Sequence, residues 1–353
     1  MTIYYVLVIS ILLLNIIRKK GRISDKVFSV LACTMFIIIV GFRGKMVGAD
    51  TWNYYDSFYA YSDYSLSEII ALNKNDFGFF IFQWFIQYLF HDFVFLNLAA
   101  AIIFYVPLAV FLHENSKDIG LSYIILMAFN FFQFSMTGTR QTMAFGFAIW
   151  AIRESMKEKP KILKVFFWVL IGTSFHRSCI IALLYPLLRT LANKKWTAHS
   201  LLPLVCLFFL FRSQITKYAI SVLAPEAYKG YVEYVSGGGT TTYVIFIFLL
   251  FIGLFLLSKS EINRYSKKRY YLVLFGCAVA MQALVIENSI IFRVVWYFSI
   301  ILTVYLPEVI HSKRLTRQSQ VLISMVTYVG VLFMYLNITI ASANVVPYQF
   351  FMN

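Results

Sequence analysis

Apolar runs long enough to cross a lipid bilayer recur along almost the whole chain, and this pattern limits what the chain can fold into. A helix of roughly 20 apolar residues crosses the hydrocarbon core of a bilayer. Because polar side chains at helix ends can reach the interface, shorter runs are accepted too, and twelve runs are predicted to span. They lie at residues 2–17, 27–42, 93–112, 121–137, 139–155, 162–175, 178–192, 200–212, 242–257, 270–286, 291–309 and 321–337.

The composition excludes other classes of protein. Only 13% of the 353 residues are charged, whereas 60% are hydrophobic and 19% aromatic. A soluble domain carries about 25% charged residues, so this chain has too little polar surface to cover a globule in water. We therefore expect an all-α polytopic membrane protein, with residues 1–353 forming a single integral membrane domain. A soluble enzyme, a disordered chain and a fibre are excluded.

The distribution of Lys and Arg predicts the orientation. The formal net charge is +15, which in a soluble protein would point to nucleic acid. If residues 77–90 do not span, 22 of the 31 Lys and Arg fall on one side, in segments 18–26, 113–120, 153–164, 189–199, 258–269 and 311–320. The positive-inside rule then predicts that this side is cytoplasmic and that both termini lie outside. No nucleic-acid partner is expected.

The outer face holds two long segments, 43–92 and 213–241. Loops on a rigid scaffold are where function concentrates. In the first segment, residues 65–72 and 77–90 are predicted to form two amphipathic helices on the membrane surface. In the second, the glycine-rich turn at 236–240 is either a hinge or a lid, and it lacks the pattern of a phosphate-binding loop.

A few charged side chains fall at the outer ends of helices, where such groups usually face a cavity. Arg140 is the most informative, because only Thr137-Gly138-Thr139 separates it from the preceding apolar run. An arginine at a helix N-terminus adds its charge to the backbone N–H groups there, and this combination attracts phosphate. The same level of the predicted topology also holds Arg43, Asp50, His176, Glu287 and Arg293.

We expect Arg43, Arg140 and Arg293 to hold the pyrophosphate of a lipid-linked substrate. Asp50 or His176 would act as general base for an attacking hydroxyl, and Arg140 would also stabilise the leaving group. Each residue has a simpler alternative: Arg43 could reach lipid headgroups, Glu287 could pair with Arg293, and His176 could be structural. Weaker sugar contacts are predicted for Gln141, Trp52, Tyr55, Glu287 and Tyr348, although the aromatic residues fit an interfacial belt equally well.

Five stretches then occur in order from residue 41 to residue 351: GFRGKMVGADTWNYY, TGTRQTMAFGFAIWAI, SFHRSCIIALLYPL, FRVVWYFSIILTVYLPEVI and VVPYQFF. Together they resemble the EpsG family of bacterial exopolysaccharide and capsule proteins. That family is grouped with the Wzy-type polysaccharide polymerases, which include O-antigen polymerases, and it resembles the GT-C glycosyltransferases.

The resemblance implies polymerisation of repeat units carried on undecaprenyl pyrophosphate at the outer face of the bacterial cytoplasmic membrane. The growing chain would be the donor, and a sugar hydroxyl of the next lipid-linked unit the acceptor. Besides this lipid-linked oligosaccharide and membrane lipids, a flippase and a chain-length regulator are candidate partners. The GT-C enzymes commonly place a catalytic Asp in the first outer loop, before two membrane-surface helices, and Asp50 with 65–72 and 77–90 looks similar.

Two further residues fall in stretches typical of the family, Arg140 in RQxxA and His176 in SFHxS. The chain departs from the metal-using GT-C enzymes, because no second acidic residue closely follows Asp50 and the next are Asp56 and Asp63. We therefore expect an inverting glycosyltransferase that uses no metal and no other cofactor.

Two other functions stay open at this stage. A flippase or exporter of lipid-linked sugars would place charges at the midplane and show repeats or paired broken helices, neither of which this sequence contains. A membrane O-acyltransferase would place its acyl-donor contacts on the cytoplasmic side, where the sequence offers only Lys and Arg that explain orientation.

Overall fold

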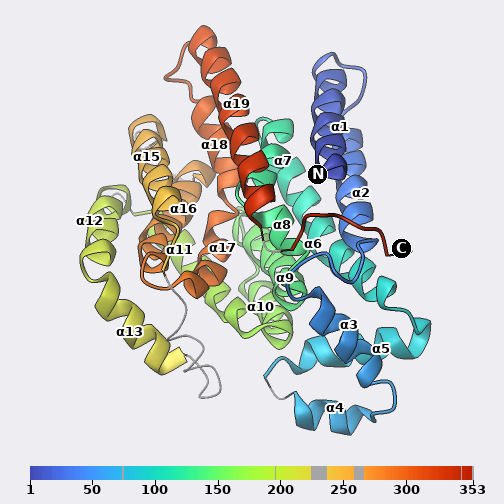
Figure 1. The fold of residues 1–353 in the computed structure, drawn as a ribbon. Coiled ribbons are helices and arrows are strands. Elements are labelled where there is room, and N and C mark those ends of the chain that lie inside the picture. Colours follow the sequence, from blue (N-terminus) through green and yellow to red (C-terminus); the bar gives the residue numbers. More distant parts are fainter. Residues whose placement is uncertain (74, 195, 224–236, 258–265, 343, 352–353) are drawn as a thin grey trace. The chain divides into compact units, whose positions relative to one another are not determined.

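A computed structural model describes residues 1–73, 75–194, 196–223, 237–257, 266–342 and 344–351. These residues form helices and no strand (Figure 1), so the expected all-α class is confirmed. The chain divides into two compact units, each described here by itself. The expected single membrane domain stays a prediction. Part of the second outer segment, 224–236, lies outside the described residues.

The first unit comprises Met1–Glu154, Lys161–Leu183 and Arg317–Asn353. Its helices are α1 (Thr2–Lys19), α2 (Asp25–Gly41), α3 (Thr51–Ala60), α4 (Leu66–Leu72), α5 (Phe77–Phe90), α6 (Phe93–Asn115), α7 (Ile119–Ala128), α8 (Phe131–Ser135), α9 (Thr139–Ser155), α10 (Ile162–Phe175), η1 (Arg177–Leu183) and α19 (Arg317–Ala341). The second unit comprises Ser155–Pro160 and Leu184–Thr316. It holds α11 (Leu184–Ala192), α12 (Thr197–Leu210), α13 (Arg212–Leu223), α15 (Thr240–Leu257), α16 (Lys267–Val285), η2 (Ser289–Ile291), α17 (Phe292–Ser299) and α18 (Leu302–Ile310).

Five described helices, α1, α6, α15, α16 and α19, are long and apolar enough to cross a membrane. The number rises to seven if the bent pairs α12 with α13 and α17 with α18 each count as one span. The structure therefore supports a membrane protein but not the predicted count of twelve spans. Several apolar runs are shorter or interrupted: 121–137 is broken at Asn130, whose φ of 65° ends α7 and starts α8.

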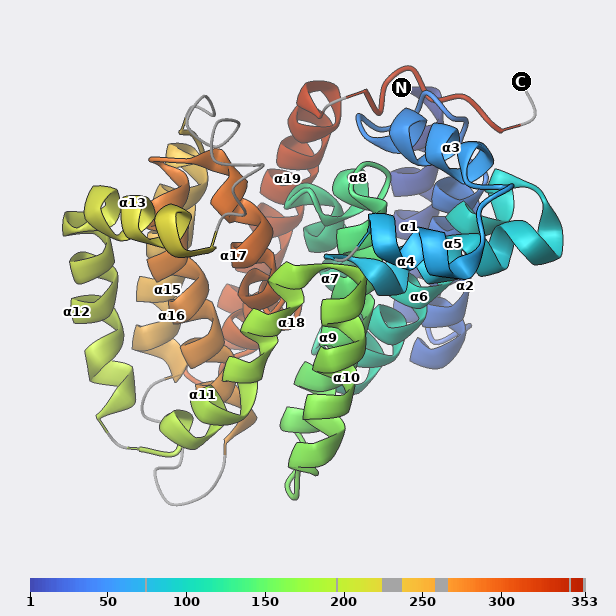
Figure 2. The same cartoon turned by 90° about the horizontal axis from the view of Figure 1, so that it is seen from below.

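Capping explains where the helix α4 begins. The Ser65 hydroxyl accepts from the backbone N–H of Glu68, and the Glu68 carboxylate accepts from the backbone N–H of Ser65, so a complete capping box starts α4. The predicted helices at 65–72 and 77–90 are both present as α4 and α5. Figure 2 shows α3, α4 and α5 grouped together within the first unit.

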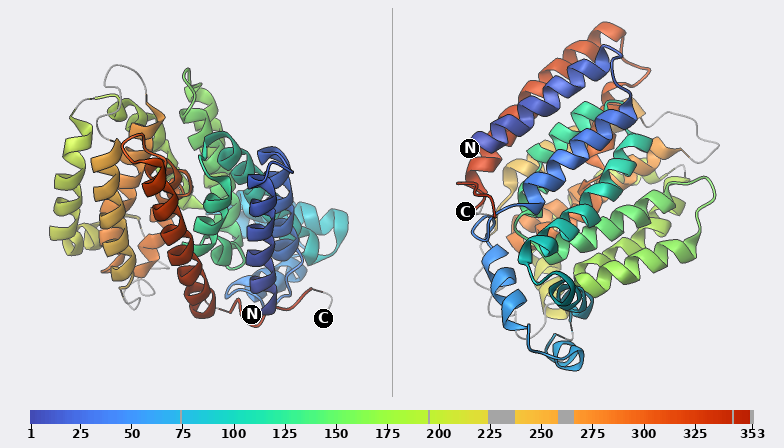
Figure 3. Two further views of the ribbon diagram at one scale, coloured as in Figure 1. Left: turned by 90° about the horizontal axis from the view of Figure 1, so that it is seen from above. Right: turned by 90° about the vertical axis from the view of Figure 1, so that its right-hand side faces the viewer.

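The helix α5 begins and ends at the same end of the first unit. Asp76, directly before it, bonds Arg140 at the start of α9, and Phe93, shortly after it, packs on Phe351. Near the same end, the Tyr4 hydroxyl donates to Val345, which places the N-terminus beside the C-terminal segment (Figure 3). We call this the Arg43 end.

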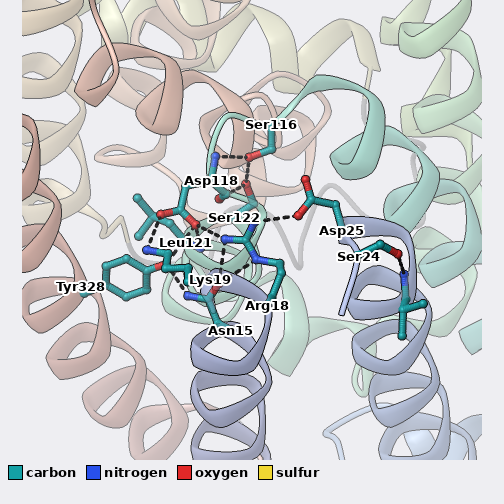
Figure 4. Close-up of polar contacts among 11 residues, drawn as sticks. Asn15, Arg18, Lys19, Ser24, Asp25, Ser116, Asp118, Leu121, Ser122 and Tyr328 are labelled. Carbon is teal, nitrogen blue, oxygen red and sulfur yellow. Dashed lines mark hydrogen bonds and ion pairs between the residues drawn. The ribbon is translucent and has the colours of Figure 1, made fainter. Parts of the chain in front are cut away.

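A polar network occupies the opposite end of the first unit (Figure 4). The Asp118 carboxylate, whose residue is 4% exposed, caps α7 and accepts from Arg18 at 3.4 Å, Lys19 at 3.1 Å and the Tyr328 hydroxyl at 3.1 Å. Asn15 joins Tyr328 to Arg18. The network ties α1, α7 and α19 together, and we call this the Asp118 end.

The Asp118 end gathers segments that the distribution of Lys and Arg assigns to one side. Besides the contacts of segments 18–26 and 113–120, the Arg153 guanidinium forms a two-pronged pair with the Glu114 carboxylate. The backbone N–H of Lys161 donates to Glu154. These contacts bring three of the six basic segments together, and the predicted alternation of spans stays a prediction.

The second unit is built around α16. Most residues of this helix are buried, and it packs on α11, α12, α15, α17 and α18. At one end of the unit Lys268 pairs with Glu308 at 2.8 Å, and elsewhere Arg212 pairs with Glu287 at 2.7 Å.

Candidate functional site

The loop between α2 and α3 is fixed by two side-chain hydrogen bonds and one glycine. The Thr51 hydroxyl donates to the carbonyls of Val47 at 2.7 Å and Met136 at 2.9 Å. Gly48 has a φ of 100°, and a Cβ there would lie 2.0 Å from the Met136 carbonyl oxygen. Only glycine fits this position, which presses the loop against the turn before α9.

Arg43 lies in this loop and is fully buried. Its Nη1 donates to the carbonyl of Val40 at 2.5 Å and its Nη2 to the hydroxyl of Thr139 at 3.1 Å. No carboxylate in the described part of the chain forms an ion pair with it. Burial without such a partner lowers the pKa of Arg43 to about 10. Arg43 therefore contacts the start of α9 rather than solvent.

The C-terminal segment lies along the backbone on either side of Arg43. The N–H of Gly44 donates to Gln349 at 2.7 Å, and the N–H of Phe351 donates to Phe42 at 2.8 Å. The Tyr348 hydroxyl donates to the carbonyl of Ile39 at 2.7 Å, and burial raises the pKa of Tyr348 to about 12 against the opposing effect of Arg43. The C-terminal segment, about 300 positions later in the chain, thus covers the guanidinium of Arg43.

Arg140 is the second residue of α9, and aromatic rings and a carboxylate surround it. Its Nη1 donates to Asp76 Oδ2 at 2.8 Å and its Nε to the Tyr54 hydroxyl at 3.4 Å. Its guanidinium carbon lies 5.8 Å from the ring centre of Tyr54 and 5.7 Å from that of Phe80. The side chain keeps 28% of its surface exposed. It is therefore held in place and still reachable.

Sequence reasoning missed Asp76. This residue stands at the N-cap position of α5, yet its side chain makes no capping hydrogen bond and pairs with Arg140 instead. Burial raises the pKa of the Asp76 carboxyl, while Arg140 and Arg177 act in the opposite direction. An Asp before an apolar helix usually caps that helix. For this reason the sequence did not indicate its ion pair with Arg140. The signal was the isolated acid beside the predicted surface helix.

Asp50 stands at the N-cap position of α3, one turn before Tyr54. Its side chain makes no capping hydrogen bond, and it is half-buried. Burial raises the pKa of Tyr54; Arg140 lowers it, and the Asp50 charge raises it further. Tyr54 therefore lies within electrostatic reach of both Asp50 and Arg140, which connects two of the predicted catalytic residues.

His176 ends α10 in an extended conformation. Its Nδ1 lies 2.7 Å from the Ser178 hydroxyl and accepts from the Ser178 backbone N–H at 3.3 Å. In the neutral ring this leaves the proton on Nε2. The next residue, Arg177, donates to the side chain of Asn75, directly before Asp76. The turn carrying His176 is thus joined to the start of α5.

The EpsG family model matches residues 26–350, nearly the whole chain. The chain belongs to the EpsG family. Comparisons with curated proteins and with solved structures gave no significant match. Membership of the EpsG family indicates a membrane protein connected with exopolysaccharide polymerisation, and it confirms the resemblance of the five stretches.

Two aromatic residues of this EpsG chain lie beside the site, Trp52 exposed and Tyr55 half-buried. Trp52 is 45% exposed and stacks on Tyr55, with ring centres 5.6 Å apart. Lys45 Nζ lies 5.3 Å from the Trp52 ring and 4.8 Å from the Tyr55 ring. By contrast Gln141, on the first turn of α9, is only 3% exposed.

The remaining predicted residues of the EpsG chain, Glu287 and Arg293, belong to the second unit. Glu287 pairs with Arg212. Arg293 is the second residue of α17 and is half-buried. The expected cluster of Arg43, Arg140 and Arg293 stays a prediction. Arg43 hydrogen-bonds Thr139, the residue directly before Arg140. Among the described residues, no three His, Cys, Asp or Glu side chains are close enough together to hold a metal.

Proposed function

We propose that this EpsG-family chain is a polysaccharide polymerase. It joins oligosaccharide repeat units carried on undecaprenyl pyrophosphate at the outer face of the cytoplasmic membrane. The observation that carries the proposal is that Arg140 hydrogen-bonds Tyr54 while the charge of Asp50 also acts on Tyr54, in a chain whose family is connected with exopolysaccharide polymerisation. A carboxylate beside an arginine at a helix N-terminus suits a reaction with a hydroxyl nucleophile and a phosphate leaving group.

The proposed orientation places the Arg43 end outside and the Asp118 end in the cytoplasm. It is supported by the basic segments that gather at the Asp118 end. Helices α4 and α5 then lie at the outer surface, with apolar side chains such as Leu72, Tyr88 and Phe90 exposed for contact with lipid. The arrangement is similar to the membrane-surface helices of GT-C enzymes.

Arg140 binds the pyrophosphate of the donor. A guanidinium presents two parallel N–H groups that match two phosphate oxygens, and Arg140 stands on the first turn of α9, where the helix dipole favours an anion. As the bond between sugar and phosphate breaks, negative charge grows on the leaving pyrophosphate. Arg140 stabilises this charge most in the transition state, so its loss should lower turnover as well as binding.

Asp50 is the general base. Its carboxylate removes the proton from the acceptor hydroxyl, the hydroxyl oxygen forms the new bond to the anomeric carbon, and the bond to pyrophosphate breaks with its electron pair leaving on phosphate. One direct displacement inverts the anomeric configuration. The alternative base, His176, accepts through Nδ1 from Ser178 and keeps its proton on Nε2, so it suits donation of a hydrogen bond to substrate better than removal of a proton.

Arg43 supports the same site without contacting the substrate. Because it is fully buried and bonds Thr139, we assign it to positioning Arg140 rather than to direct contact with pyrophosphate. Trp52 and Tyr55 would stack on a sugar of the acceptor, with Gln141 and Tyr348 as weaker contributors. The sugar contact of Glu287 and the pyrophosphate contact of Arg293 stay predictions from the sequence.

The test is the product made in cells that lack the gene. A polymerase predicts single repeat units on the lipid carrier, displayed outside. A flippase predicts units trapped inside, and an acyltransferase predicts full-length polymer without acyl groups. Complementation with Arg140→Ala or Asp50→Asn should not restore polymer, whereas Arg22→Ala, at an exposed arginine of the Asp118 end, should restore it. Normal polymer from both site variants would refute the site.

A further inference from the structure

The pair between Asp76 and Arg140 puts an anion where the proposed function requires a different anion to bind. The two side chains come from residues 64 positions apart and meet at 2.8 Å. They are 14% and 28% exposed, so the contact lies at the edge of the buried part of the unit. Arg140 is therefore paired with a carboxylate that solvent and substrate can reach.

Helix capping does not account for this carboxylate. Asp at an N-cap normally accepts from backbone N–H groups of the first turn, but the Asp76 side chain makes no such bond with α5. Ser65 and Asp92 do cap α4 and α6. The Asp76 side chain thus does not cap α5 and instead accepts a hydrogen bond from Arg140 on another helix.

The carboxylate is a weak ligand for Arg140. Burial raises the pKa of Asp76 despite the nearby charges of Arg140 and Arg177, so its ionised form gains less from the site than it loses on leaving water. A pyrophosphate carries more negative charge and offers more acceptor oxygens. It should displace a single carboxylate from the same guanidinium.

The rings below Arg140 allow such an exchange. Tyr54 and Phe80 both lie within 6 Å of the guanidinium carbon, and the Tyr54 hydroxyl accepts from Nε. These contacts do not involve Asp76, so they keep the arginine in position while its Nη1 partner changes.

We propose that Asp76 is an internal substitute for the substrate's phosphate. It holds Arg140 while the site is empty and releases it when pyrophosphate binds. This inference rests on the proposed function and adds a positioning residue that competes with the donor. Since Asp76 also interacts with the backbone of Arg177, its release reaches the turn that carries His176.

The experiment measures binding of undecaprenyl pyrophosphate to the purified full chain in nanodiscs. Asp76→Asn keeps the shape of the side chain and removes the competing charge. It should bind about two- to five-fold tighter than the wild type, the range expected for loss of one partly exposed ion pair. Asp76→Glu keeps a carboxylate and should bind like the wild type. Asp63→Asn, at an exposed acid of the same outer segment, controls for net charge.

A double variant separates this inference from the proposed function. Asp76→Asn should bring no gain when Arg140 is already Ala, because the competition runs through Arg140. If Arg140→Ala weakens binding but Asp76→Asn leaves it unchanged or weaker, Asp76 is only a structural anchor and the inference is overturned while the function stands. If Arg140→Ala binds like the wild type, both are overturned. Unfolding temperatures of each variant show whether it is folded.

Discussion

The guanidinium of Arg43 donates to the hydroxyl of Thr139 at 3.1 Å, and Thr139 directly precedes Arg140. A buried arginine, Arg43, thus holds the residue next to Arg140, whose side chain is partly exposed. The buried arginine lies under the C-terminal segment, so the ends of the chain contribute to the position of the residue that we propose binds pyrophosphate.

This relationship predicts matched effects at the two residues. Thr139→Val removes the acceptor hydroxyl and Arg43→Met removes the donor, so each should lower the rate of polymerisation about 10- to 100-fold by misplacing Arg140. Thr139→Ser keeps the hydroxyl and should retain most activity. The rate is measured with purified protein and lipid-linked repeat units.

The stability of Arg43→Met separates positioning from folding. Replacing a buried charge that has no carboxylate partner by an apolar side chain of similar length should leave the unfolding temperature near that of the wild type. A variant that is both folded and fully active would contradict the positioning role of Arg43.

Gly48 should tolerate no side chain. In Gly48→Ala the new Cβ would collide with the Met136 carbonyl at a φ of 100°, which should cost about 1–3 kcal/mol and displace Asp50. Gly330→Ala is the control, because a Cβ there meets no atom within 4 Å. The unfolding temperature and the polymerisation rate should both fall for Gly48→Ala, and neither should fall for Gly330→Ala. Equal behaviour of the two variants would show that the loop is not held in this conformation.

The network at the Asp118 end should contribute stability rather than catalysis. Asp118→Ala leaves Arg18 and Lys19 without their shared carboxylate and should cost about 2–3 kcal/mol. Asp25→Asn, which removes a carboxylate whose side chain is 59% exposed, should change stability by less than about 1 kcal/mol. Protein that remains folded should polymerise normally. A large loss of activity at unchanged stability would assign this end a role in the reaction.

The raised pKa of Asp76 predicts a pH dependence. The folded chain holds the Asp76 proton more tightly than the unfolded chain does, so the carboxyl lowers stability as pH rises through the interval above the ordinary pKa of Asp. Asp76→Asn should abolish this component, and its stability relative to the wild type should increase from pH 4 to pH 7. Unfolding in detergent at several pH values measures it. A relative stability that falls over the same interval would contradict the sign.

Local signals in the sequence predicted part of the fold well. The amphipathic stretches at 65–72 and 77–90 correctly predicted the helices α4 and α5. Three of the segments rich in Lys and Arg, 18–26, 113–120 and 153–164, contact one another in the first unit, whereas the orientation in a membrane stays a prediction. The number of spans could not be predicted, because hydropathy does not reveal the turn at Asn130 or the bends between α12 and α13 and between α17 and α18.

The candidate site depended more on contacts between distant residues. Arg140 was predictable because a charged side chain between two apolar runs is costly in a membrane and usually has a function. The full burial of Arg43 was not, since the residues that cover it follow about 300 positions later. Asp76 was hidden because an Asp before a helix usually caps it. The sequence suggested that Glu287 could form an ion pair with Arg293, but in the structure Glu287 pairs with Arg212.

Polymerisation by the purified chain tests the central claim most directly. Wild-type protein in nanodiscs is given lipid-linked repeat units alone, and the products are separated by length. We predict a ladder of products from the wild type and from Arg22→Ala, and only single units from Asp50→Asn and Arg140→Ala. A ladder from both site variants, or none from folded wild-type protein that binds the lipid, would contradict the account.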